Sequence, residues 1–258
     1  MNTNKLQVFV FAMLFVVGAF TGCVDEDDDD KTTTDNTIKI GFLNPITGPL
    51  EPDAPGFKWG ADQAISDLAK MYPNETFELV ELDSGCSGDV AGPAAQTLVD
   101  SGVVAVVGAA CSGASMSANA VLAAAGIPMI SYASTNPGLS DEAKYPHFYR
   151  NVPSDAIQGP AGAAMMADAG VTNESLAILH MTNDYGSGLA DSIKAAWEED
   201  GKLCSAGMQG YEETTTNFDA MVANVTGASD CNAVYLSSYI TDAAGILEAL
   251  AEAGFTLS

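Results

Sequence analysis

Two apolar runs, each ending in a loop rich in hydroxyl groups, constrain the fold of this chain more than any other feature. Residues 103–108 lead into a loop that contains Ser112 and Ser115, and further along the chain residues 127–130 lead into the polar loop 131–136. Short continuous apolar runs are typical of buried parallel strands. Ligands bind at the carboxyl ends of such strands in open α/β sheets. The two loops therefore predict one crevice that holds a small ligand through hydroxyls, a carbonyl and helix-terminal N–H groups.

The remaining chain alternates between strand and helix patterns, which predicts an α/β fold with parallel sheets flanked by helices. A joint near Pro153 divides the pattern into an N-terminal lobe, residues 38–150, and a second lobe, residues 151–258, with a cleft between them. The expected strands are 38–43, 76–82, 103–107, 127–130, 175–180, 202–209 and 233–236, with a short extended segment at 147–150. The expected helices are 57–71, 90–101, 115–125, 155–169, 189–200, 217–225 and 243–253. Residues 254–258 look like the entry to a further strand, so we expect the second lobe to be incomplete and the C-terminal part truncated.

The first 22 residues resemble a lipoprotein signal peptide. Lys5 precedes an apolar run, residues 8–20, that is short for a membrane span and typical of an export signal. The run ends at Gly22-Cys23, which predicts lipidation of Cys23, with an ordinary secretory signal cleaved nearby as the alternative. Residues 23–37 contain six consecutive acids and no apolar face. We expect a disordered tether there rather than a calcium site, which needs fixed ligand geometry.

Charge and cysteine content exclude several further classes. The formal net charge is −25 and Arg150 is the single arginine, so binding of nucleic acid through its phosphates is excluded. Besides Cys23, the chain has an even number of cysteines, which in an exported protein predicts two disulfides. These cysteines are Cys86, Cys111, Cys204 and Cys231. A zinc site is the alternative, but the chain has no Cys-x-x-Cys pair with a nearby histidine.

The motifs of common enzymes are incomplete in this sequence. Residues 108–113 have the glycine spacing of a phosphate loop, but Ala114 stands where the lysine is required. Residues 85–89 lack the last glycine of a nucleophile elbow, and the two histidines stand in no Ser-His-Asp spacing. Residues 186–188 lack the third glycine of a dinucleotide loop. We therefore expect a binding protein, without metal or cofactor, rather than an enzyme.

What remains is a set of side chains suited to binding. Short hydroxyls follow the strands of the first half, and they are Ser112, Ser115, Ser134 and Thr135. Their alternative role is to cap the following helices, and the two roles are compatible because a capped helix N-terminus also binds anions. Tyr185 and Tyr239 each follow a strand of the second half in a polar loop, where we expect them to form cleft walls rather than core contacts.

Several motifs, in their order and spacing, resemble the branched-chain (Leu/Ile/Val) amino-acid binding proteins of ABC transporters, which have the type I periplasmic-binding fold. The resemblance runs from about residue 38 to the C-terminus. It is carried by Gly48-Pro49, residues 60–64, Cys86 with Cys111-Ser112, residues 134–137, residues 185–190, Phe218-Asp219 and Tyr239.

The resemblance implies roles for individual residues. Ser112 would donate to a ligand α-carboxylate, while the Ala133 carbonyl and the Thr135 hydroxyl would accept from the α-ammonium group. Ser134 belongs to the same ligand-binding loop, and Tyr185 and Tyr239 would close from the second lobe. Cys86 and Cys111 would form the disulfide of the family. Two departures stand out: the acidic residue that usually meets the ammonium from a later loop is missing, and Asp53 stands where an aromatic wall is common.

The resemblance also implies a function and a location. We expect a monomeric lipoprotein on the outer face of the cell membrane that captures a branched-chain or similar small amino acid between its lobes. It would deliver this amino acid to an ABC permease. A ligand-sensing domain of the same fold that feeds a signalling pathway is the alternative.

Overall fold

The computed structural model describes residues 37–199 and 201–255. The predicted signal segment, Cys23 and the tether up to residue 36 lie outside the described residues. The strands are β1 (Thr37–Asn44), β2 (Thr76–Asp83), β3 (Ala105–Val107), β4 (Met129–Ser131), β5 (Phe148–Arg150), β6 (Leu176–Met181), β7 (Leu203–Tyr211) and β8 (Ala233–Ser237). The helices are α1 (Ala54–Met71), α2 (Gly88–Asp100), α3 (Ser112–Ala124), α4 (Asp155–Asp168), α5 (Asp184–Trp197), α6 (Asp219–Gly227) and α7 (Ile240–Glu252), with short 3-10 turns η1 (Glu51–Asp53) and η2 (Pro137–Ser140).

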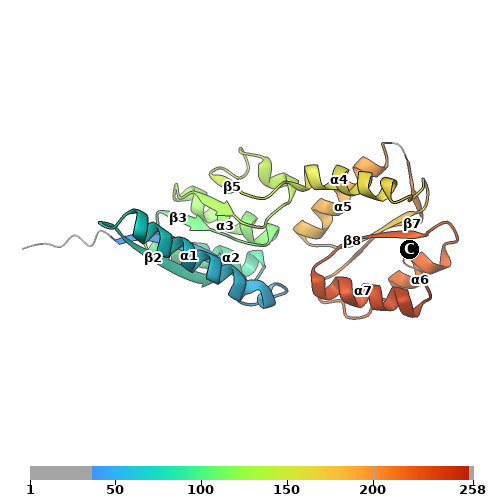
Figure 1. The fold of residues 1–258 in the computed structure, drawn as a ribbon, viewed down its shortest axis with the longest axis horizontal. Helices are drawn as coiled ribbons and strands as arrows, with labels where there is room; N and C mark the ends of the chain where they lie inside the picture. The colour runs from blue at the N-terminus through green and yellow to red at the C-terminus, as the bar shows by residue number, and fades with distance from the viewer. Residues whose placement is uncertain (1–36, 200, 256–258) are drawn as a thin grey trace, which may run out of the picture. The chain divides into compact units, whose positions relative to one another are not determined.

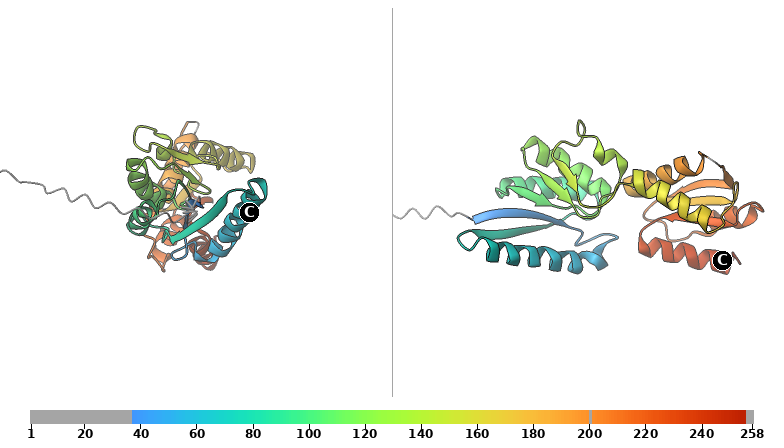
Figure 2. Two further views of the ribbon diagram at one scale, coloured as in Figure 1. Left: turned by 90° about the vertical axis from the view of Figure 1, so that its left-hand side faces the viewer. Right: turned by 45° about the horizontal axis from the view of Figure 1, so that its top comes forward.

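Five parallel strands form the first sheet in the order β2-β1-β3-β4-β5 (Figure 1). Helices α2 and α3 cover one face of this sheet and α1 lies on the other (Figure 2). The core between the sheet and α2 and α3 is built from Leu43, Leu98, Val106, Leu122 and Met129, each at most 1% exposed. We refer to β1–β5 with α1–α3 as the first lobe.

Three parallel strands form the second sheet in the order β7-β6-β8. Every residue of the central strand β6 is buried, as expected for a parallel strand with helices on both faces. Ile178 packs on the side of α4 and α5, whereas Leu179 packs on the side of α6 and α7. We refer to β6–β8 with α4–α7 as the second lobe. The predicted two-lobed α/β architecture with parallel sheets is confirmed.

Several helices begin earlier than the sequence predicts. Helix α3 begins at Ser112 rather than at residue 115, and α5 begins at Asp184 rather than at residue 189. The glycines of the first turn of α5 suggested a loop, but the Asn183 side chain accepts from the Gly186 N–H at 2.8 Å and starts the helix there. The prediction that Tyr185 lies in a loop was therefore wrong, since Tyr185 is in α5. Tyr239 does lie in the short loop after β8, where it is the N-cap of α7.

The four cysteines of the described residues lie as two disulfide pairs. Cys86 pairs with Cys111 at a Cα–Cα distance of 5.1 Å, and Cys204 pairs with Cys231 at 5.2 Å. Both distances are ordinary for disulfides. The sulfurs are thus paired with one another, which removes the basis for the zinc alternative.

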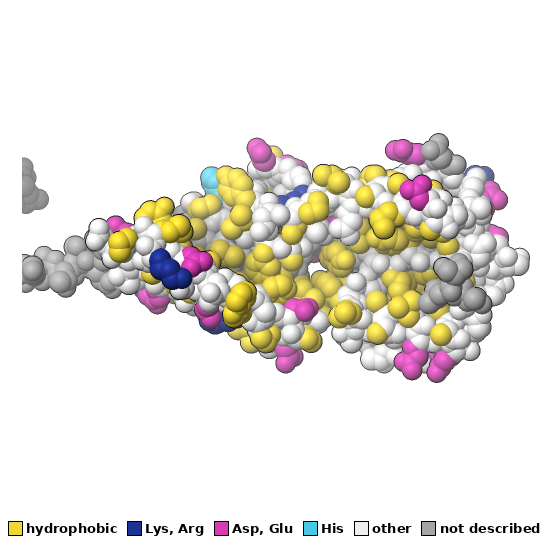
Figure 3. Space-filling model, in the orientation of Figure 1, with side chains coloured by type: hydrophobic (Ala, Val, Ile, Leu, Met, Phe, Trp, Pro, Cys, Tyr) yellow, Lys and Arg dark blue, Asp and Glu magenta, His cyan; other side chains and the backbone are white. Residues whose placement is uncertain are grey.

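The surface of the described part is acidic. On the face drawn in Figure 3, carboxylate side chains are spread over both lobes and basic side chains are few, in keeping with the net charge of −25. Between residues 37 and 255, no helix has the length and apolar character needed to cross a membrane.

Candidate functional site

The loops at the carboxyl ends of β3 and β4 meet the first turns of α5 and α7 around a cavity of about 210 Å³. This is smaller than the ~300–1,000 Å³ of sites for drug-sized ligands, so it suits a small molecule. The residues that line it are Leu50, Ala110, Cys111, Ser112, Ala133, Thr135, Gln158, Tyr185 and Tyr239. Of the six residues predicted to bind a ligand, the structure brings all but Ser134 to this cavity.

Ser134 instead joins the two loops to each other. Its hydroxyl lies 2.8 Å from Ser115 Oγ and donates toward the carbonyl oxygens of Ala109 and Ala110, at 3.2 and 3.1 Å. The Ser131 hydroxyl adds a 2.6 Å bond to the Ala109 carbonyl. These buried hydroxyls hold the β3 and β4 loops together, which explains why the loops share one crevice.

Ser112 is placed to donate a hydrogen bond to a ligand. It is the first residue of α3, and its buried Oγ accepts from the Asn136 backbone N–H at 3.3 Å, which leaves the hydroxyl proton available. Cys111, the N-cap residue, provides no side-chain cap, and the first N–H groups of a helix have no partner within it. The positive end of the helix therefore borders the cavity beside the Ser112 O–H, an arrangement that binds a carboxylate.

Thr135 is placed to accept a hydrogen bond from a ligand, whereas Ser112 is placed to donate one. Its hydroxyl donates to Oδ2 of Asp155 at 2.9 Å, so the lone pairs of Oγ1 remain to accept from a ligand. The residue Ala133 of the same loop also lines the cavity, which agrees with the expected role of its carbonyl oxygen as a second acceptor. Two acceptors beside a carboxylate suit an ammonium group.

Asp155 is a buried acid that analysis of the sequence did not identify as a site residue. It is the first residue of α4, its side chain is fully buried, and its Oδ1 has no hydrogen-bond partner among the described residues. Burial raises the pKa of Asp155, against the opposing effects of the Thr135 hydrogen bond and the Arg150 charge. Asp155 does not itself line the cavity but contacts the lining residue Thr135. A buried carboxylate without an ion-pair partner is costly, and an ammonium group beside Thr135 would offset part of that cost.

Two stacked tyrosines form the wall from the second lobe. The rings of Tyr185 and Tyr239 lie 5.3 Å apart between centroids, with 9° between their planes. Burial raises the pKa of Tyr185 to about 12, so its hydroxyl stays neutral near neutral pH. Tyr239 Oη lies 3.4 Å from Cys86 Sγ, and the hydroxyl is the donor because a disulfide sulfur carries no proton. The tyrosine stack thus rests on the disulfide of the first lobe.

Two residues that line the cavity, Leu50 and Gln158, also went unrecognised in the sequence. Leu50 supplies an apolar wall from the loop after β1, whereas Asp53, three residues on, is exposed in η1. Gln158 reaches the cavity from α4, one turn beyond Asp155. Periodicity could indicate that Gln158 and Asp155 share a face of α4, but it could not place that face beside Thr135.

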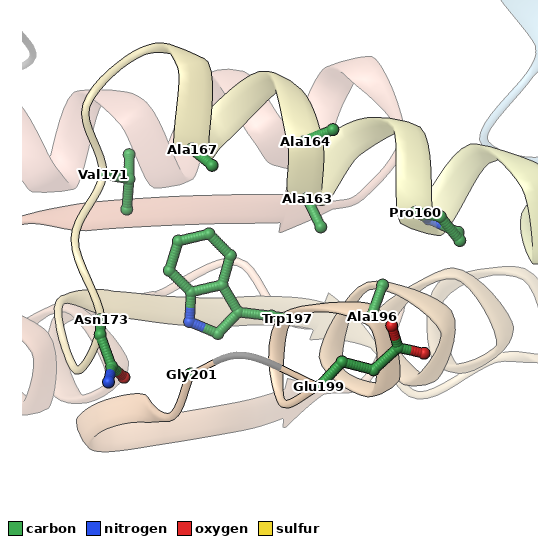
Figure 4. A pocket seen from close by; sticks show the side chains of 10 residues that line it. All are labelled: Pro160, Ala163, Ala164, Ala167, Val171, Asn173, Ala196, Trp197, Glu199 and Gly201. Atoms are coloured by element: carbon green, nitrogen blue, oxygen red, sulfur yellow. The ribbon is translucent and has the colours of Figure 1, made fainter.

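Two other cavities lack these features. Figure 4 shows one of about 370 Å³ in the second lobe, where alanines of α4 and Trp197 of α5 form the wall and Glu199 is the charged lining residue. The other, of about 470 Å³, lies between α1 and the first sheet, against Phe42 and Val107. Neither combines a helix N-terminus with acceptors for a cation, which distinguishes both from the cavity of about 210 Å³.

Comparison with known proteins gives a consistent set of similarities. A sequence profile described as "Periplasmic binding protein" matches residues 37–258. The leucine-, isoleucine-, valine-, threonine- and alanine-binding protein of Pseudomonas aeruginosa is 28% identical over 221 residues, which are 85% of this chain and 58% of that protein. The Leu/Ile/Val-binding protein of Escherichia coli is 26% identical over 219 residues, 84% of this chain and 59% of that protein.

Solved structures agree with these relatives. The branched-chain amino acid transporter substrate-binding protein of Streptococcus pneumoniae, crystallised with isoleucine, has a TM-score of 0.74 at 25% identity, covering 85% of this chain and 62% of that one. A leucine-binding protein of Thermotoga maritima has the same TM-score at 24% identity, which supports a likeness of fold. The chain spans less than two thirds of the length of these relatives.

Proposed function

Because the chain belongs to the periplasmic binding protein family and has its type I fold, we propose that it binds a small α-amino acid of the branched-chain type in the interlobe cavity. Curated relatives named for leucine, isoleucine and valine binding support this ligand class. The family is one of binding proteins that act outside the cytoplasm.

The opposite polarity of two hydroxyl groups carries the proposal. Ser112 accepts from a backbone N–H and can donate to a ligand carboxylate, whereas Thr135 donates to Asp155 and can accept from a ligand ammonium. Both line one cavity of about 210 Å³ together with the apolar side chain of Leu50. A small zwitterion with an aliphatic side chain satisfies all three features.

Titration calorimetry with leucine and two truncated analogues tests this proposal. 4-Methylpentanoate lacks the ammonium group and 3-methylbutylamine lacks the carboxylate, while both keep the aliphatic chain. We expect leucine to bind and each analogue to lose about a hundredfold or more in affinity, because each leaves one buried polar cluster without its partner. Equal affinity for leucine and 4-methylpentanoate would show that Asp155 and Thr135 do not interact with the ammonium group of the ligand.

The two disulfides offer a matched pair of variants. Replacing either pair by alanines should lower the free energy of unfolding by about 3.5 kcal/mol, because the bridged loops are of similar length. Loss of Cys86–Cys111 should also weaken leucine binding, since Cys111 lines the cavity and Cys86 contacts Tyr239. Loss of Cys204–Cys231 should leave the affinity unchanged. Thermal unfolding and calorimetry measure both effects, and equal loss of affinity in both variants would contradict this assignment.

We further propose that the protein is a monomeric lipoprotein, anchored through Cys23 on the outer face of the membrane, that passes its ligand to an ABC permease. Support comes from the Gly22-Cys23 sequence after an apolar run and from the relative described as part of a branched-chain amino acid transporter. A Cys23→Ala variant should move from the membrane fraction to the soluble fraction on cell fractionation. Equal retention of variant and parent in the membrane would show that Cys23 is not the anchor.

A further inference from the structure

The first two turns of α5, in the second lobe, touch the first lobe at two points where a glycine makes the approach possible. A Cβ atom on Gly188 would lie 2.5 Å from Nδ2 of Asn136, and a Cβ atom on Gly113 would lie 2.6 Å from Oδ2 of Asp184. Real Cβ atoms do not approach other atoms this closely. Each glycine therefore accepts a side chain of the opposite lobe in the space that its own side chain would fill.

Asn136 is the centre of this contact. Its Nδ2 donates to the Asp184 carbonyl in the second lobe, and its Oδ1 accepts from the Gly138 N–H at 2.7 Å in its own lobe. Its backbone N–H donates to Ser112 Oγ. One residue thus touches both the opposite lobe and the hydroxyl that we assign to the ligand carboxylate.

We infer that Asn136, Gly113, Asp184 and Gly188 form an interlobe latch that couples the ligand head group to closure of the lobes, with Asn136 as a positioning residue. This inference rests on the proposed function. The Asn136 N–H fixes the Ser112 hydroxyl as a donor toward the ligand. The side chain of Asn136 holds the turn of α5 that carries Tyr185, the residue after Asp184, against the cavity.

Gly188→Ala tests the latch without altering a residue that lines the cavity. The added methyl group takes the place of Asn136 Nδ2, while alanine is a better helix former than glycine inside α5, so the variant should fold. We expect about a tenfold rise in the Kd for leucine, the effect of losing one interlobe hydrogen bond. Gly60→Ala in α1 is the matched control, because its Cβ would meet nothing within 4 Å, and its Kd should not change.

The Asn136→Asp variant distinguishes the interlobe contact of Asn136 from its role in the turn of its own lobe. Aspartate keeps the backbone N–H for Ser112 and an acceptor for the Gly138 N–H, but it cannot donate to the Asp184 carbonyl and places a negative charge against it. We expect at least the loss seen for Gly188→Ala. Leucine affinity equal to that of the parent in both variants would overturn the latch.

A cross-link measures the contact without any ligand. The Cβ position of Gly113 lies 3.8 Å from Cβ of Asp184, a spacing typical of disulfides, so Gly113→Cys with Asp184→Cys should form an interlobe disulfide, identified by peptide mapping. Leucine should speed its formation, and Gly188→Ala should slow it in the absence of leucine. If leucine does not bind the parent chain, the proposed function fails. The rate of disulfide formation without leucine still tests whether the latch contact exists. Equal rates with and without Gly188→Ala would overturn the latch alone.

Discussion

Replacing Asp155 by asparagine is expected to weaken leucine binding by about a hundredfold or more. The amide has nearly the shape of the carboxylate and can still accept from the Thr135 hydroxyl, but it carries no charge for the ligand ammonium. Removing one partner of a buried, hydrogen-bonded charge pair typically costs about 2–5 kcal/mol, and each 1.4 kcal/mol is a tenfold change in affinity. Titration calorimetry at neutral pH measures the loss directly.

The stability of the Asp155→Asn variant distinguishes a binding role from a structural one. Burial raises the pKa of Asp155, so the unliganded fold disfavours the charged form at neutral pH. The variant should therefore unfold at a temperature no lower than the parent. Asp230→Asn is a suitable control, because Asp230 binds Ser205 in the second lobe, outside the cavity lining, and its loss should not change leucine affinity. A destabilised Asp155→Asn variant with parental affinity would contradict the assignment.

The raised pKa of Asp155 also predicts how binding depends on pH. An ammonium ligand favours the ionised carboxylate, so the affinity should be full above the raised pKa and fall as the pH drops through it. The unliganded fold should behave in the opposite way. The contribution of Asp155 to its stability is present below the unfolded-state pKa, near 3.8, and is lost as the pH rises through the raised folded-state pKa. Asp155→Asn should flatten both trends.

Strong local patterns explain which parts of the fold the sequence could predict. The apolar runs that became β3 and β4 and the buried strand β6 fix the parallel sheets, and the polar residues that follow them mark the cavity. Ser112 and Thr135 could be found because each lies in the polar segment that follows one of these runs. Ser134 follows the same run, but its side chain faces the Ala109 and Ala110 carbonyls, and no local pattern shows which way a loop side chain turns.

Asp155 could not be found in this way, because its role depends on contacts between distant parts of the chain. In the sequence it is only an acid after Ser154 at a helix start, which is the ordinary pattern of a capped helix. Its carboxylate reaches Thr135 because β5 pairs beside β4, with Ser131 opposite Arg150, and α4 begins shortly after β5. Strand pairing of this kind is a tertiary property. The same holds for the glycines of α5, which indicated a loop in the sequence but allow close packing in the structure.

Ser112→Ala and Thr135→Ala are each expected to weaken leucine binding by about ten- to a hundredfold, since a hydrogen bond to a charged group contributes about 1.5–3 kcal/mol. Neither should unfold the protein, because loss of a hydroxyl near a helix end costs only about 1 kcal/mol. Ser117→Ala is the control in the same helix as Ser112: it loses a hydroxyl bond to the Gly88 carbonyl but does not border the cavity of about 210 Å³.

A second ligand assigns each hydroxyl to one end of the amino acid. Leucinamide keeps the ammonium group but replaces the carboxylate by a neutral amide, so it should gain less than leucine from the Ser112 O–H and the N-terminus of α3. Ser112→Ala should therefore weaken leucine more than leucinamide, whereas Thr135→Ala should weaken both equally, because the ammonium is common to them. Calorimetry of the parent and both variants with both ligands completes the cycle. If Ser112→Ala weakens the two ligands by the same factor, its hydroxyl does not meet the carboxylate and the orientation of the bound amino acid must be reversed.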